Sequence, residues 1–250
     1  QSDTAVSASA VTLFAVCPRK YYLSRYLGFE ESRMSSQPLP KDDTSDSERD
    51  ETDPSEFGRQ VHALLAGEDA PGAGPEALRL VKNFEGSEWG RRLLRATRIE
   101  REQEFLILVG PPAEQRLLRG QMDLWFEDAG EIVLLDYKTD QASAAEVAGK
   151  AAEYALQLRL YALALEQIAR KRPDRAVLYF LRPNTAAEIP VDDASLEAAR
   201  AKVEELYQAQ SSQIFPLHVG KHCFQCPHYR GACPAQHPEA LAASQATQSK

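Results

Sequence analysis

Cysteine is scarce in this sequence, and its absence from the middle of the chain is informative. Only four of the 250 residues are cysteines, and none lies between Cys17 and Cys223. The chain also lacks an apolar run long enough to span a bilayer, and it does not start with the basic and apolar regions of a signal peptide. We therefore expect a cytoplasmic protein, in which the reducing environment disfavours disulfides and four thiols favour metal binding.

An excess of basic residues is missing as well. The chain has 29 Lys and Arg against 37 Asp and Glu, a net charge of −8, whereas affinity for nucleic acid comes largely from Lys and Arg that neutralise phosphates. However, the segment 41–56 has eight acidic and two basic residues, so it accounts for −6 of the −8. The rest of the chain is nearly balanced, and its composition does not exclude DNA as a partner.

The four cysteines have the spacing of metal ligands. Cys223 and Cys226 form a C-x2-C pair, and Cys233 follows shortly after it. Two residues between cysteines allow both thiolates to face one centre, and Cys17 would add a fourth ligand from the other end of the chain. Four thiolates suit both zinc and an iron–sulfur cluster, so the spacing leaves the occupant open.

Hydrophobic periodicity predicts an α/β protein. Helices are predicted over 7–27, 55–66, 76–95, 144–171 and 193–210, and strands over 98–109, 115–126, 131–138 and 176–182. Pro18 should bend or split the first helix. The polar segment at about 31–55 is predicted to be an acidic, mobile surface insert, and 241–250 a disordered tail. This order of elements indicates an α/β core with additional helices.

The third predicted strand ends in an arrangement with chemical potential. Asp136 and Lys138 are two residues apart, so on a strand both side chains face the same side. A carboxylate can bind a hard cation such as Mg²⁺, and a neighbouring ammonium can orient water or stabilise charge on a phosphoryl group. Asp123 on the preceding strand can approach Asp136 if the two strands pair. The alternative is a surface salt bridge between Asp136 and Lys138.

Four further residues have an ordinary structural interpretation beside a functional one. His62 lies in an apolar helix, where a packed histidine is the usual role. Gln157 and Tyr161 are four residues apart on the long predicted helix and share a face, although Tyr161 could simply belong to the core. Glu102 alternates with two other glutamates on the first strand, which is typical of a solvated face, whereas alignment with a substrate groove would be the functional interpretation.

Four segments occur in an order that resembles a known family. They are G-R-Q-V-H at 58–62, R-G-Q-M-D at 119–123, D-Y-K at 136–138 and Q-L-R-L-Y at 157–161. Together they resemble the RecB-like branch of the PD-(D/E)XK nuclease superfamily. The cysteine pattern resembles the iron–sulfur subgroup of that branch, to which AddB-type helicase–nuclease subunits and CRISPR-associated nucleases belong. The resemblance implies a restriction-endonuclease-like core, with a mixed central sheet flanked by helices, in a single nuclease domain over 1–240.

The resemblance also implies a role for each candidate residue. The ligands of a catalytic Mg²⁺ or Mn²⁺ would be His62, Asp123, Asp136 and the backbone carbonyl of Tyr137. Lys138 would position or activate the attacking water, and Gln157 and Tyr161 would line the site and steady the substrate strand. Glu102 matches a glutamate often found on the first strand. A [4Fe–4S] cluster, with zinc as the alternative, would join the two termini through Cys17, Cys223, Cys226 and Cys233.

The function implied by the resemblance is metal-dependent hydrolysis of DNA. The chain would act as an exonuclease on single-stranded DNA or DNA ends, as a module of a helicase–nuclease or of a DNA-repair or recombination protein. A helicase domain or subunit would then be its partner. One alternative is a catalytically silent DNA-binding or scaffolding module that keeps the fold and the cluster. Another is a zinc-stapled interaction domain unrelated to nucleic acid, which the acidic composition favours.

Overall fold

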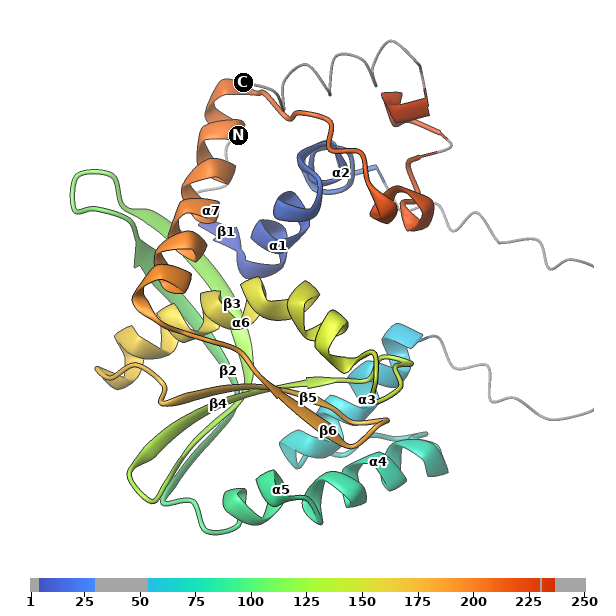
Figure 1. Cartoon of the computed structure of the whole chain (residues 1–250), viewed down its shortest axis with the longest axis vertical. Coiled ribbons are helices and arrows are strands. Elements are labelled where there is room, and N and C mark those ends of the chain that lie inside the picture. Colours follow the sequence, from blue (N-terminus) through green and yellow to red (C-terminus); the bar gives the residue numbers. More distant parts are fainter. Residues whose placement is uncertain (1–4, 30–53, 230, 237–250) are drawn as a thin grey trace, which may run out of the picture. The chain divides into compact units, whose positions relative to one another are not determined.

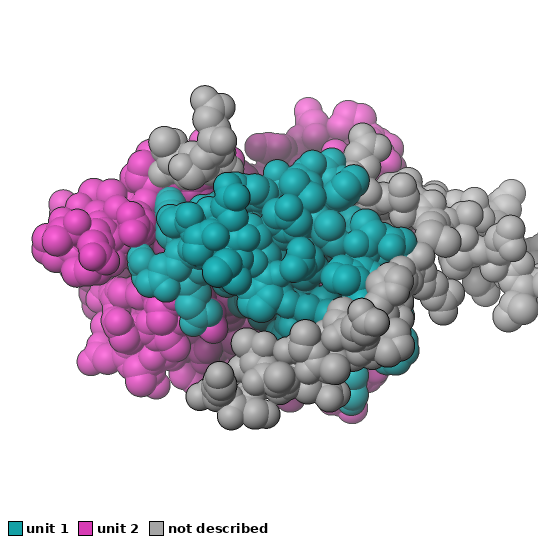
Figure 2. All heavy atoms as spheres, turned by 90° about the horizontal axis from the view of Figure 1, so that it is seen from above, with its two compact units in different colours: residues 1–4, 9–50, 204–250 teal, residues 5–8, 51–203 magenta. Residues whose placement is uncertain are grey.

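The computed structural model describes residues 5–29, 54–229 and 231–236. The chain divides into two compact units (Figure 2), of which the larger comprises residues 5–8 and 51–203 and the smaller residues 1–4, 9–50 and 204–250. The predicted insert, apart from its last two residues, and the predicted tail lie outside the described residues. The prediction of a single domain over 1–240 stays a prediction.

A mixed six-stranded sheet forms the centre of the larger unit (Figure 1). Its strands are β1 (Ala5–Ser7), β2 (Arg98–Val109), β3 (Arg116–Asp128), β4 (Glu131–Lys138), β5 (Arg175–Phe180) and β6 (Thr185–Glu188). β1 pairs in parallel with β3, and β4 with β5, whereas the other neighbours are antiparallel. β3 is the hub of the sheet, because it pairs with β2 along nearly its whole length and with β1 and β4 near its two ends.

Helices cover both faces of this sheet (Figure 1). α6 (Val147–Ala169) lies on one face and links β4 to β5, which is the crossover that a parallel pair requires. α3 (Pro54–Ala66), α4 (Pro75–Glu85) and α5 (Glu88–Leu93) lie on the other face, where buried side chains such as Val61, Phe84 and Leu135 form one core. The predicted α/β architecture, a mixed sheet flanked by helices, is confirmed.

The helix predicted over 76–95 is two helices, so that prediction is wrong. α4 ends at Glu85, and α5 begins at Glu88 after the Ser87 hydroxyl accepts a hydrogen bond from the Gly90 amide at 3.1 Å. The turn is tight, since a Cβ on Gly90 would lie 2.2 Å from the carbonyl oxygen of Phe84. A serine cap and a close backbone approach therefore interrupt a hydrophobic pattern that runs on without a break.

The helix predicted over 7–27 is interrupted at Pro18, as expected. α1 (Ala8–Val16) ends before Cys17, α2 (Pro18–Tyr21) begins with the proline at its first position, and a π-helical turn follows over Tyr22–Tyr26. The smaller unit also includes the end of α7 (Asp193–Ser212) and short 3-10 turns at Lys221–Gln225 and Pro234–Gln236. Within the described part of the chain, no helix is both long and apolar enough to cross a membrane.

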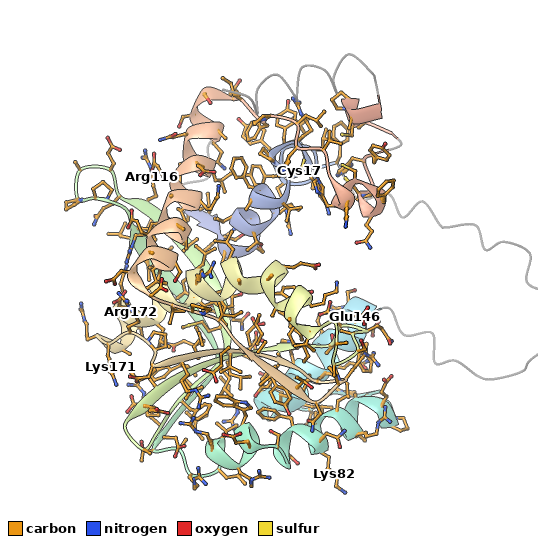
Figure 3. The ribbon with its side chains drawn as sticks, in the orientation of Figure 1. Cys17, Lys82, Arg116, Glu146, Lys171 and Arg172 are labelled. Atoms are coloured by element: carbon orange, nitrogen blue, oxygen red, sulfur yellow. The ribbon has the colours of Figure 1, made fainter. Side chains whose placement is uncertain are left out.

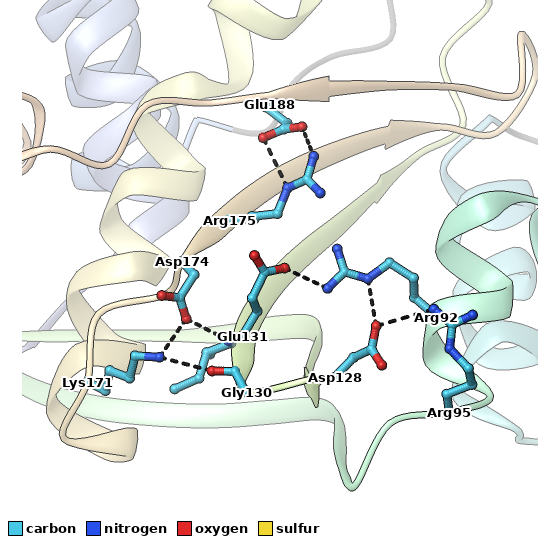
Figure 4. Close-up of polar contacts among 10 residues, drawn as sticks. Arg92, Arg95, Asp128, Gly130, Glu131, Lys171, Asp174, Arg175 and Glu188 are labelled. Atoms are coloured by element: carbon cyan, nitrogen blue, oxygen red, sulfur yellow. Dashed lines mark hydrogen bonds and ion pairs between the residues drawn. The ribbon is translucent and has the colours of Figure 1, made fainter.

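Ion pairs fasten the turn between β3 and β4 (Figure 4). Arg92 of α5 donates hydrogen bonds to Asp128 Oδ2 and to Glu131 Oε2, each at 2.8 Å. The bond from Arg92 lowers the pKa of the Asp128 carboxyl. Because the turn sets the register of the two strands, these contacts also determine which residues face each other at the opposite ends of β3 and β4.

Candidate active site

β3 and β4 bring two carboxylates together where their pairing ends. The antiparallel ladder between them ends at Leu124 opposite Leu135, so the next residues in register are Asp123 and Asp136. A side-chain contact replaces the ladder at this point, because Asp123 Oδ2 accepts a hydrogen bond from the backbone amide of Tyr137 at 2.8 Å. The register of a single hairpin thus places both acids at the same end of the sheet.

Three side chains from three different elements meet beside this point. The Nδ1 atom of His62, on α3, lies 3.6 Å from Asp123 Oδ2 and 3.9 Å from Glu102 Oε1 on β2. One ligand atom from each of the three lies within 4.8 Å of the others, and among the described residues no other group of His, Cys, Asp and Glu is so closely gathered. An imidazole and two carboxylates are donors that a divalent cation binds.

Glu102 reaches this group from an unusual backbone conformation. It stands opposite Asp123 in the register of β2 and β3, and its φ is +47°. A positive φ is uncommon for a residue other than glycine and costs energy in the middle of a strand. The Gln121 side chain donates a hydrogen bond to the Glu102 carbonyl at 3.1 Å. Strain of this kind persists where the surrounding structure holds it, and it is often found at functional sites.

Negative charge in the site is concentrated and buried. Burial and the charge of Asp136 raise the pKa of Asp123 to about 7. Burial lowers the pKa of His62, but Glu102 and the other two acids outweigh it, so the pKa of His62 is raised. Asp136 Oδ2 is buried and makes no hydrogen bond. Carboxylates this close repel one another unless a cation lies between them, so the site favours a bound cation.

Lys138 is held against Asp136 by contacts from α6. Its Nζ atom lies 2.7 Å from Asp136 Oδ2, as an ion pair, and donates a hydrogen bond to Gln157 Oε1 at 3.0 Å. Gln157 Nε2 in turn donates to the Tyr161 hydroxyl at 2.8 Å. Burial and the charge of Asp136 raise the pKa of Tyr161, so its hydroxyl stays protonated. The amine is therefore fixed next to the carboxylates.

The residues predicted for the site come together in the larger unit, although not all in one group. His62, Asp123 and Glu102 form the close group, while Asp136 stands opposite Asp123 on β4 without belonging to it. The contact of Tyr137 with Asp123 uses its backbone amide. The metal ligands predicted from the resemblance, including the Tyr137 carbonyl, stay a prediction.

Two residues at this site were not predicted from the sequence. The ring of Tyr154 lies over the Lys138 ammonium, and its hydroxyl donates to Asp140. A signal was present, because Tyr154 precedes Gln157 by three residues on the same helix and therefore shares its face. Asp140 likewise follows Lys138 by two residues, but an acidic residue in a loop has no pattern that distinguishes it.

The four cysteines all lie in the smaller unit. Cys17 stands between α1 and α2 (Figure 3), and the other three belong to the C-terminal segment. All four are free thiols, and all but Cys226 are buried. Burial raises the pKa of the Cys233 thiol, and the charges of the other three thiols raise it further. The four sulfurs are therefore close enough to interact electrostatically.

Curated relatives of the chain carry one kind of name, because each is described as a subunit of an ATP-dependent helicase/nuclease. The relative from Alkaliphilus metalliredigens is 31% identical over 136 residues, which cover 50% of this chain and 11% of that protein. The relative from Syntrophomonas wolfei is 35% identical over 117 residues, covering 44% and 10%. That from Desulforudis audaxviator is 30% identical over 168 residues, covering 53% and 14%. The chain thus spans about a tenth of the length of these relatives.

A family profile matches much more of the chain than any of these relatives does. The profile describes the PD-(D/E)XK nuclease superfamily and matches residues 5–234. The matched range includes the helix with His62, the hairpin with both aspartates, the helix that holds Lys138 and all four cysteines. The chain therefore belongs to the PD-(D/E)XK nuclease superfamily.

Proposed function

We propose that the chain is a divalent-metal-dependent deoxyribonuclease that works as a module of a helicase–nuclease. The observation that carries this proposal is the meeting of His62, Glu102 and Asp123 at one point, with Asp136 and Lys138 beside it. An imidazole, several acids and an amine around one centre are the groups that metal-assisted hydrolysis of a phosphodiester requires. Membership of a nuclease superfamily supports the same conclusion.

The donor set suits a hard divalent cation such as Mg²⁺ or Mn²⁺. We assign it the ligands His62, Asp123, Asp136 and the Tyr137 carbonyl, with Glu102 close to the same position. The buried Asp136 oxygen that makes no hydrogen bond is a ligand position of the kind that a cation satisfies. When bound, the cation polarises the phosphate and lowers the pKa of water.

The other residues of the site manage the water and the substrate strand. Lys138 brings a positive charge to the edge of the carboxylate group, where it orients the attacking water and offsets the negative charge that develops on the phosphate. Gln157 holds the amine, and Tyr161 holds Gln157. The same two side chains line the site and steady the strand to be cut.

The names of the relatives point to the substrate and the partner. Those proteins are described as ATP-dependent helicase/nuclease subunits, and this chain corresponds to about a tenth of their length. We therefore propose that a helicase domain or subunit delivers single-stranded DNA or DNA ends to this site, for exonucleolytic cleavage in repair or recombination. The near balance of charge outside the segment 41–56 is compatible with this role.

We also propose a [4Fe–4S] cluster on the four cysteines, with zinc as the competing occupant. Zinc holds its thiolates about 2.3 Å from the metal, which brings the sulfurs to within roughly 4 Å of one another. Among the described residues, no three cysteine sulfurs lie within 4.8 Å of one another. Each thiolate of a cluster binds a different iron, so the wider spacing favours the cluster, which would stabilise the smaller unit.

Cleavage of end-labelled, linear single-stranded DNA with Mg²⁺ or Mn²⁺ tests the nuclease proposal. We expect nucleotides to be released from the ends only when the cation is present, and circular single strands to resist. Cutting of circles would replace exonuclease by endonuclease action. Binding without cleavage would favour the catalytically silent module, and neither binding nor cleavage would favour the zinc-stapled interaction domain. A colourless protein with stoichiometric zinc after anaerobic purification would reject the cluster.

A further inference from the structure

The ring of Tyr154, on α6, covers the ammonium of Lys138. The Nζ atom lies 4.2 Å from the ring centroid, well within the distance at which a cation is attracted to the face of an aromatic ring. Only 13% of the Lys138 side chain is exposed, and such a contact is stronger where water is excluded. The ammonium is thus enclosed by a carboxylate, an amide and a ring.

The ring itself is anchored at its hydroxyl end. The Tyr154 hydroxyl donates to both carboxylate oxygens of Asp140, at 2.9 and 3.1 Å. Burial and this hydrogen bond raise the pKa of Tyr154, so the hydroxyl remains a donor. The Lys150 ammonium lies 4.0 Å from Asp140 and holds that carboxylate in turn. The anchor therefore joins the loop after β4 to the start of α6 (Glu146, which precedes the helix, is labelled in Figure 3).

A lysine needs several contacts if its ammonium is to stay in one place. Its four-carbon stem is flexible and its charge is a point that pairs without directional preference. The proposed function assigns Asp136 to the cation, so this carboxylate must be shared and cannot hold Lys138 by itself. Gln157 contacts the ammonium from one direction only. The ring of Tyr154 provides the remaining contact.

We propose that Tyr154 is a positioning residue for Lys138: its ring holds the ammonium, and its hydroxyl holds the ring through Asp140. This inference rests on the proposed function, in which Lys138 serves the attacking water. It gives the ring and the hydroxyl separate tasks. Substitutions that remove one and keep the other therefore have different effects.

Three variants separate these tasks in a cleavage assay. Tyr154→Leu removes the ring, and we expect kcat to fall about 5- to 30-fold with KM for DNA unchanged, as the usual strength of a shielded cation–π contact implies. Tyr154→Phe is the matched control, because it keeps the ring; with one hydrogen bond lost, we expect a fall of about 3-fold or less. Asp140→Ala should resemble Tyr154→Phe. Equal losses in the Leu and Phe variants would overturn the role of the ring.

A double-mutant cycle excludes a merely structural role. In a Lys138→Ala background the ring has no ammonium to hold, so adding Tyr154→Leu should cause no further loss of kcat. Two residues that act as a unit give such non-additive effects. A full second loss in the double variant would mean that Tyr154 acts elsewhere and would overturn the proposal.

Covalent labelling of lysines with an amine-reactive reagent gives a readout that does not depend on cleavage. Mass spectrometry should find Lys138 labelled more slowly than Lys150 in the unaltered protein and in Tyr154→Phe, and considerably faster in Tyr154→Leu. If the unaltered protein cuts no DNA, the proposed function fails while the labelling still tests the contact. If Tyr154→Leu leaves the labelling of Lys138 unchanged, the positioning role fails whether or not DNA is cut.

Discussion

Asp136 and Lys138 are two residues apart on β4, yet they have separable tasks at the residue scale. Asp136 is buried and has an oxygen without a hydrogen bond, whereas Lys138 makes an ion pair and a hydrogen bond and lies under a ring. The carboxylate is therefore suited to hold a cation and the amine to act on what the cation binds. Substitution of one residue at a time distinguishes these roles.

The first prediction compares Asp136→Asn with Lys138→Ala. Without the charge of Asp136 the site loses a cation ligand, so we expect Mn²⁺ binding to weaken strongly and cleavage to fall below detection. Lys138→Ala should retain Mn²⁺ binding but lose about 10²- to 10³-fold in kcat, the usual size of an electrostatic or proton-transfer contribution. Titration calorimetry with Mn²⁺ and single-turnover cleavage measure the two quantities. Cleavage by Lys138→Ala at the unaltered rate would remove the lysine from the mechanism.

How far the sequence predicts the site depends on how local each signal is. The period of a strand places Asp136 and Lys138 on one side, and the pairing of a hairpin brings Asp123 opposite Asp136, so these positions follow from simple rules. Glu102 does not follow from them. Its alternation with other glutamates indicates a solvated face, and no local pattern predicts that its φ is positive or that α3 brings His62 within 3.9 Å of it.

At the scale of elements, the turn between α4 and α5 shows how tertiary contacts override periodicity. The hydrophobic pattern over 76–95 continues through the turn, but Ser87 caps a new helix and Gly90 lies against the end of α4. β1 and β6 have the same origin. A-V-S and T-A-A-E have little propensity for strands, and they form strands because β3 and β5 offer unpaired edges beside them.

The second prediction concerns the two glycines at this turn. A Cβ on Gly90 would lie 2.2 Å from the Phe84 carbonyl, whereas one on Gly86 would lie 3.6 Å from its nearest neighbour, an ordinary contact. We therefore expect Gly90→Ala to lower the free energy of unfolding by about 1–3 kcal/mol, as overpacking does, and Gly86→Ala to change it little. Chemical denaturation of both variants measures the difference. Equal stabilities would contradict the close approach of α5 to α4.

The third prediction concerns the ion pair between α5 and the β3–β4 turn. The hydrogen bond from Arg92 lowers the pKa of Asp128 in the folded protein relative to its ordinary value of 3.8. A depressed pKa contributes stability that is present above the unfolded pKa and is lost as pH falls through the folded pKa. Asp128→Asn should therefore have a lower Tm than the unaltered protein at pH 5 to 7, and the gap should close below about pH 4. Melting curves across this range decide the matter, since a gap that persists at pH 3 would exclude the carboxylate as its source.

At the scale of the whole molecule, the two ends of the chain fold into one unit. Within the smaller unit, Leu23 packs with Cys233 and Ala235, and Ser24 lies within hydrogen-bond distance of His228, at 2.8 Å. These contacts bring the segment after α2 to the segment that carries three of the cysteines. A metal centre on all four thiols would make the same connection covalently, and it would close a loop of most of the chain.

The fourth prediction is that Cys17→Ser releases this connection. Loss of one of four thiolates should reduce the bound iron and sulfide, or the bound zinc, and should lower the stability of the protein by as much as about 5 kcal/mol, the limit set by the entropy of closing so long a loop. Ser24→Ala is the matched control, because it removes the contact with His228 in the same unit but no thiol. Metal analysis, visible absorption and melting curves of anaerobically purified protein compare the two. If Cys17→Ser keeps its full metal content while Ser24→Ala melts at a lower temperature, packing alone joins the two ends, and Cys17 is not a ligand.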